Sequence, residues 1–221
     1  MQKYFISITA IFLLLFSSCV TSVHRLATYD KVVAENKITG NWNYKGMTIT
    51  VESLLLSKLV KETKHAGKNV FEGVERNDSL LLSKSYIFRY EKNGLIYNML
   101  ASLVRLNDQL FLDTYPANVD STNGATSFTG FRSVGGAEWT PAHSFAKVIF
   151  KNDKHLELQF LGGEFLVNQI KNGKATIKHE TDDLFDTMVI TASSKDLQQF
   201  LIKYGNDKRL YDEANSVTLE K

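Results

Sequence analysis

Apolar and polar residues alternate along much of the chain between residues 47 and 160. A period of two is that of a β-strand, because successive side chains point to opposite faces of a sheet. Short turns such as Asn93-Gly94 separate several of these runs, and connections this short join antiparallel neighbours. The pattern therefore predicts an antiparallel meander. Its clearest strands are 47–52, 86–91, 109–115, 146–151 and 155–160.

The run from Leu95 to Leu106 is different, because it is apolar on both of its faces. Such a strand fits a barrel with an apolar lumen, and it also fits a sheet covered by helices. Other segments carry weaker strand patterns: 70–75, 80–83, 175–179, 187–191 and 217–220.

Helical spacing of apolar residues interrupts the meander. In the first such segment, Leu26, Tyr29 and Val32 fall on one side of a helix. The last segment follows Ser193, a good N-cap residue, and precedes Gly205, a natural C-cap. The predicted helices lie within 20–37, at 163–171 and at 194–204.

The stretch 116–143 has little periodicity and is longer than an inert connection usually is. It carries the large aromatic residues Phe128, Phe131 and Trp139. Long surface loops with exposed aromatic residues often contact partners, so these three side chains are candidates for a protein–protein contact.

The N-terminus has the parts of a secretory signal. One positive charge at Lys3 precedes an apolar run over 4–16, and small residues then lead to Cys19. A helix over the apolar run would rise only about 20 Å, which is too short for the roughly 30 Å hydrocarbon core of a bilayer. A cleaved signal is therefore favoured over a transmembrane anchor.

The residues Leu15-Phe16-Ser17-Ser18-Cys19 resemble the lipobox of bacterial lipoproteins. The resemblance implies cleavage before Cys19, a diacylglycerol on its thiol, and anchoring of the chain to a membrane by several acyl chains. Val20 at the next position is similar to the outer-membrane default of lipoprotein sorting, and we expect a domain that faces the periplasm. The alternative is an ordinary signal peptide that happens to contain a cysteine.

Composition narrows the functional classes. The chain has 221 residues, of which 43% are hydrophobic, so it can form a core and is not generally disordered. Its formal net charge of +2 argues against a broad nucleic-acid-binding surface. A single cysteine excludes an internal disulfide and a thiolate zinc cage.

Motifs of catalysis do not stand out in this chain. It contains no Gly-x-Ser-x-Gly elbow and no phosphate-binding glycine loop, and the histidines form no ligand pair with helical spacing. We therefore predict neither an enzyme, nor a metal site, nor a cofactor. Asp113 could act together with His143 or His155 only if the fold brings them into contact, and a structural role is favoured for each.

Gly40-Asn41-Trp42 opens the first clear strand, and the meander ends with a late helix and a final strand. This layout resembles the lipocalin-like (calycin) barrels, in which the corresponding tryptophan plugs the closed end. A half-open, strongly curved sheet is the competing architecture. The mature chain is also similar to uncharacterised lipoproteins of the Bacteroidetes type, which implies an envelope location and no particular activity.

These observations predict a signal peptide over 1–18, a lipidated tether with a short helix over 19–37, and a single β-rich domain over 38–221. We expect a lipid-anchored protein that binds a small apolar ligand or lipid without catalysing a reaction. The alternative is a protein-interaction module, such as an assembly accessory or an inhibitor, that uses the 116–143 loop. The predicted ligand contacts are Trp42, Tyr86, Phe88, Tyr97, Met99, Leu103 and Phe111.

Overall fold

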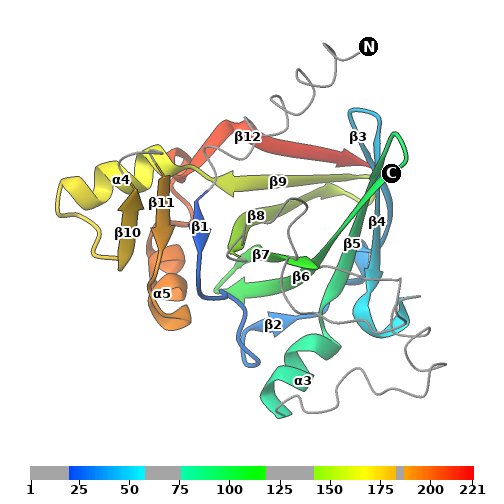
Figure 1. Ribbon diagram of the computed structural model, residues 1–221, viewed down its shortest axis with the longest axis horizontal. Helices are drawn as coiled ribbons and strands as arrows, with labels where there is room; N and C mark the ends of the chain where they lie inside the picture. The colour runs from blue at the N-terminus through cyan, green and yellow to red at the C-terminus, as the bar shows by residue number, and fades with distance from the viewer. Residues whose placement is uncertain (1–19, 58–75, 118–141, 183–186) are drawn as a thin grey trace.

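The computed structural model describes residues 20–57, 76–117, 142–182 and 187–221, and its core is a closed antiparallel barrel of eight strands (Figure 1). Each strand pairs with the next along the chain, and the last strand joins the first, which closes the ring. The barrel strands are β3 (Gly40–Tyr44), β4 (Met47–Ser53), β5 (Tyr86–Lys92), β6 (Leu95–Leu106), β7 (Gln109–Ala117), β8 (His143–Asn152), β9 (His155–Leu161) and β12 (Tyr211–Glu220).

Closure of the barrel decides between the two predicted architectures. The antiparallel meander and the lipocalin-like layout are confirmed, because β12 pairs with β9 on one side and with β3 on the other. The pairing of β12 with β3 consists of the single register pair Glu220 with Asn43, which makes this seam the narrowest bridge in the wall. The half-open sheet is therefore not the fold of this chain.

A second layer lies against the outer wall of the barrel. Two-residue strand β1 pairs with the start of β8 and continues the sheet outward to β11 and β10, while β2 pairs with β6. Helices α4 and α5 flank this extension in Figure 1. The elements are β1 (Thr21–Ser22), β2 (Val32–Val33), β10 (His179–Asp182), β11 (Thr187–Ile190), α3 (Arg76–Ser83), α4 (Gly163–Lys171) and α5 (Ser194–Tyr204). Short 3₁₀ helices complete the fold: η1 (Asn36–Ile38), η2 (Leu54–Leu56) and η4 (Lys208–Leu210).

Helices α4 and α5 have the predicted boundaries. Ser193 caps α5 by accepting a hydrogen bond from the backbone N–H of Asp196 at 3.3 Å. Gly205 ends the helix in close contact with the barrel, because a Cβ at this position would lie 2.6 Å from Oε1 of Gln109 and 2.9 Å from the ring of Phe111. Only glycine allows the helix end to approach the wall this closely.

The predicted helix within 20–37 is wrong. The backbone N–H groups of Leu26 and Ala27 bond to the carboxylate of Asp113 instead of to a preceding turn of helix. Leu26 and Val32 are buried as expected, but in an irregular segment that belongs to the folded unit and is not a free tether.

Other local predictions also changed. The stretch 80–83 is the end of helix α3 and not a strand, and a short run of leucines fits either element. The strand expected at 175–179 begins only at His179, and the final strand starts earlier than predicted, at Tyr211. The predicted strand 70–75 lies outside the described residues.

The barrel wall separates two large hydrophobic cores, and Leu54 and Ile87 form a small third cluster. An inner core lies inside the barrel, and an outer core lies between strands β6 to β8 and the layer of α5, β11 and the N-terminal segment. Neighbouring residues of β6 serve both, because Leu103 points into the inner core and Val104 into the outer one. One face of the strand over 95–106 therefore lines the barrel interior, and its other face is covered by the outer layer. Both interpretations of its sequence pattern are correct.

Candidate functional site

The two ends of the barrel are built differently. At one end, which we call the closed end, η1 precedes β3 and covers the opening. At the other end, which we call the mouth, lie the β3–β4 and β5–β6 turns, the start of β8 and the end of β9. An eight-stranded barrel is just wide enough to be filled by side chains or to hold one small ligand. The part of the interior that is filled by side chains therefore decides where a ligand could bind.

Trp42 seals the closed end. Its ring is fully buried, and its Nε1 donates to the carbonyl of Ile38 at 2.8 Å, which fixes η1 to the first strand. The Nζ atom of Lys221 lies 4.4 Å from the centre of the indole and donates to the carbonyl of Lys37 at 3.2 Å. The hydroxyl of Tyr86 accepts from the N–H of Glu35 at 2.6 Å.

Along the inner faces of β5 and β6, side chains become more exposed toward the mouth. Phe88 is fully buried, Tyr90 is half-buried, and Tyr97 at the rim is 37% exposed. The ring centres of these three residues follow one another at 6.3 and 6.4 Å, so they form a continuous aromatic ladder from the interior to the opening. Further half-buried side chains pack on the inner core, and those nearest the mouth are Tyr44, Met47, Met99, Phe160 and Val217.

The tyrosines of this ladder are neutral. Burial raises the pKa of Tyr90, and the neighbouring Tyr97 raises it further. Burial also raises the pKa of Tyr97. Their hydroxyls therefore stay protonated at physiological pH and offer polar but uncharged groups beside an apolar surface.

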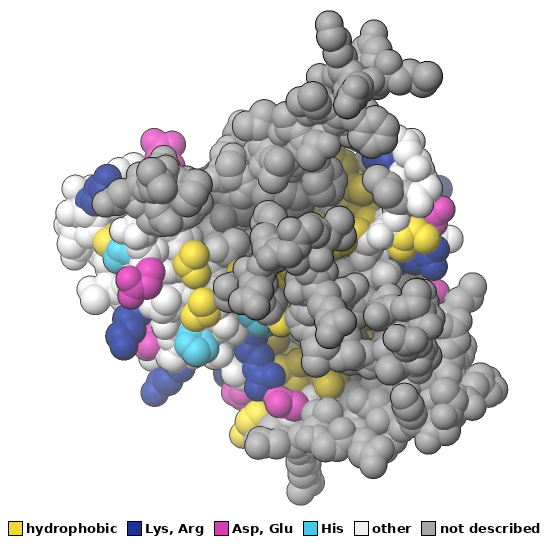
Figure 2. Space-filling view, in the orientation of Figure 1, with side chains coloured by type: hydrophobic (Ala, Val, Ile, Leu, Met, Phe, Trp, Pro, Cys, Tyr) yellow, Lys and Arg dark blue, Asp and Glu magenta, His cyan; other side chains and the backbone are white. Residues whose placement is uncertain are grey.

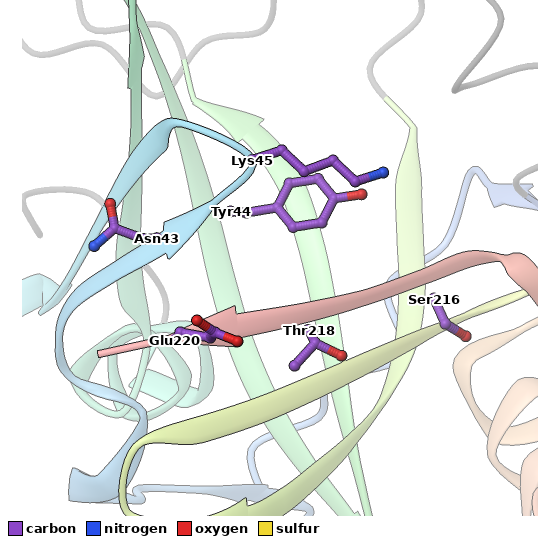
Figure 3. A pocket seen from close by; sticks show the side chains of 6 residues that line it. All are labelled: Asn43, Tyr44, Lys45, Ser216, Thr218 and Glu220. Carbon is purple, nitrogen blue, oxygen red and sulfur yellow. The ribbon is translucent and has the colours of Figure 1, made fainter.

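A hollow of about 430 Å³ lies at the seam between β3 and β12, where β3 turns away into β4 (Figure 3). In Figure 3 the side chains of Tyr44 and Lys45 extend from the β3–β4 turn, and Ser216, Thr218 and Glu220 follow one another along β12. Lys45 has a positive φ of 46°, a conformation that favours glycine or asparagine. The lining is mixed: Asn43, Tyr44, Lys45, Ser216, Thr218 and Glu220.

The structure divides the predicted ligand contacts into three groups. Trp42, Tyr86, Phe88 and Leu103 are buried in the inner core, where they pack against one another. Met99 and Tyr97 lie toward the mouth and are accessible. Phe111 belongs to the outer core, so a ligand inside the barrel would not touch it.

The fold brings Asp113 and His143 together, and His155 is not part of this contact. Nδ1 of His143 lies 2.7 Å from Oδ1 of Asp113, whose side chain is 3% exposed. The other carboxylate oxygen accepts the N–H groups of Leu26 and Ala27 at 2.7 and 2.9 Å. From the sequence, His143 was only one of two possible partners for Asp113. The residues near each of them in the chain do not show that β7 and β8 pair in this register.

This pair is arranged as a structural clamp. Ser22 lies opposite His143 in the β1–β8 register, but it is fully buried and donates its hydroxyl to the carbonyl of His24 at 2.8 Å. Its oxygen is thus committed to the backbone and is not aligned as a nucleophile. From the other side, Gln198 donates to the carbonyl of Leu26 at 2.9 Å. The carboxylate therefore holds the N-terminal segment against the outer wall.

Two groups of predicted residues lie outside the described part of the chain. These are the lipidation residue Cys19 and the loop aromatics Phe128, Phe131 and Trp139. The anchor and the loop-mediated contact remain predictions from sequence.

Within the described ranges, no helix combines the length and the apolar character needed to cross a bilayer. Comparison of the chain with protein-family models, with curated proteins and with solved structures found no match.

Proposed function

We propose that this protein is a lipid-anchored, non-catalytic binding protein of the bacterial cell envelope, and that it takes up an apolar ligand such as an acyl chain through the mouth of its barrel. The observation that carries the proposal is the gradient of burial along the barrel. The side chains around Trp42 are fully buried, whereas Tyr90, Met99 and Tyr97 nearer the mouth are partly exposed, and Phe150 near the β8–β9 turn is half-buried as well. Partly exposed apolar surface at the mouth of an eight-stranded barrel offers contacts for one small ligand.

The chemistry of the mouth favours a ligand with an uncharged, elongated body. Tyr90 and Tyr97 are the accessible part of the aromatic ladder, which continues inward to the buried Phe88, and both tyrosines are uncharged at physiological pH. Since the closed end is filled, the ligand would occupy the upper part of the barrel and would not span its length.

Binding of a fluorescent polyene fatty acid tests this proposal. Met99 lies on the inner side near the mouth, so Met99→Trp should fill the space of the ligand and weaken binding about tenfold or more. Met188→Trp is the matched control, because Met188 is also half-buried but packs against the outer core. Absence of saturable binding, or equal loss in both variants, would overturn the proposal.

The anchor is tested separately. Cys19→Ala should abolish incorporation of labelled fatty acid and release the chain from the membrane fraction, because the thiol that accepts the diacylglycerol is gone. Wild-type labelling in the variant would contradict the lipobox interpretation.

A further inference from the structure

The tips of two adjacent hairpins form a basic and apolar rim at the mouth. We use "the rim" for Lys45 in the β3–β4 turn together with Lys92, Ile96 and Tyr97 in the β5–β6 hairpin. The hairpins are neighbours, because Thr48 of β4 pairs with Glu91 of β5. Both lysines are exposed, and Ile96 and Tyr97 are 51% and 37% exposed.

The charge of the rim is positive. The carboxylate nearest to it in the β5–β6 hairpin, Glu91, lies 3.6 Å from the guanidinium of Arg89, and this pair cancels. The two lysines carry the positive charge of these turns, and the exposed carboxylate of Glu220 on β12 lines the same hollow as Lys45. Figure 2 shows hydrophobic, basic and acidic side chains close together on the right of the view, the side on which Figure 1 draws β4 and β5.

The described fold begins at the same end of the barrel. Val20 is 3% exposed and packs in the outer core, and its N–H bonds to the carbonyl of Leu161 at the mouth end of β9 at 3.4 Å. Thr21 then pairs with Ser144 near the mouth end of β8. Val20, the residue that follows position 19 in the chain, is thus part of the outer core.

We propose that the rim docks on the surface of a phospholipid bilayer that contains anionic lipids, so that the mouth of the barrel faces the membrane. This inference rests on the lipid anchor of the proposed function, since an anchor at position 19 would hold the mouth end close to the bilayer. Lysines attract anionic head groups, while tyrosine and isoleucine enter the interface between water and hydrocarbon. Together the anchor and the rim would define one membrane-facing end.

Vesicle sedimentation of a chain that cannot be acylated tests the rim independently of the anchor. The chain from residue 19 with Cys19→Ser retains every described residue. It should bind vesicles of phosphatidylcholine with phosphatidylglycerol, bind vesicles of phosphatidylcholine alone far more weakly, and lose binding as salt is raised. Lys45→Gln with Lys92→Gln should weaken binding about 25-fold, because each lysine near an anionic surface contributes about fivefold. Ile96→Ser should weaken it further.

Matched substitutions on α5 are the control, because this helix presents the same residue types on another surface. Lys195→Gln with Lys203→Gln, and Ile202→Ser, change exposed residues and should leave vesicle binding unchanged. Circular dichroism melting of each variant verifies the fold. The proposal is overturned if the unacylated chain ignores anionic vesicles, or if the α5 variants lose as much binding as the rim variants. If the rim contacts only a protein, the unacylated chain will not bind anionic vesicles. If the anchor prediction is wrong, only the acyl labelling of Cys19 will show it, and vesicle binding by the rim will be unaffected.

Discussion

The Trp42→Ala variant is expected to lose about 3–5 kcal/mol of unfolding free energy, the range found when a large buried aromatic side chain is truncated. Trp42 is fully buried at the closed end and is the largest side chain among the described residues of the inner core. The substitution also removes the donor to the carbonyl of Ile38 and the ring that faces Lys221. Urea unfolding followed by far-ultraviolet circular dichroism measures the loss.

Tyr29→Ala provides the control for this experiment. Tyr29 is 52% exposed, so its truncation should change the unfolding free energy by no more than about 0.5 kcal/mol. If Trp42→Ala were as mild as Tyr29→Ala, the tryptophan would not hold the closed end, and our account of the barrel's sealed base would be incorrect.

Asp113→Ala is expected to destabilise the fold by about 3–5 kcal/mol, because it breaks a buried, charge-assisted network. The carboxylate accepts the N–H groups of Leu26 and Ala27 and contacts Nδ1 of His143. Without it, both N–H groups lose their partner in a buried environment. Hydrogen exchange should accelerate at Leu26 and Ala27 more than in the barrel strands, since these residues are held by the lost contact.

Two further variants show whether Asp113 acts as we describe. His143→Ala leaves both backbone bonds intact and should cost clearly less than Asp113→Ala. Asp108→Ala, in the exposed β6–β7 turn, should change stability by no more than about 0.5 kcal/mol. Unchanged exchange at Leu26 in Asp113→Ala would contradict the clamp.

The barrel strands were predictable because their pattern is local and repeated. When apolar residues recur with a period of two, they show which side chains point inward. Short turns such as Asn93-Gly94 show that the strands on either side are antiparallel neighbours. Helices α4 and α5 were predictable for a similar reason, since apolar spacing and end residues agree in both. In 20–37 and 80–83 the apolar spacing was not accompanied by clear end residues, and the predicted helix and the predicted strand were wrong.

The candidate sites could be predicted only in part. The alternation in β5 and β6 indicated an aromatic inner face, but which residues are buried and which reach the mouth depends on how far the barrel is filled from Trp42 upward. Phe111 showed the limit of this reasoning. Phe111 lies between Leu110 and Leu112, so the local sequence does not show which of these side chains points inward, and here Phe111 points to the outer core.

By itself, the sequence determined the antiparallel meander, the two later helices and the position of the lone cysteine, because each depends on residues close together in the chain. Tertiary structure alone decided that β12 closes the ring, that Asp113 meets His143, and that the segment from Val20 is part of the folded unit. These contacts join residues far apart in sequence. Their register is set by the packing of two cores on opposite sides of one wall, which no local pattern contains.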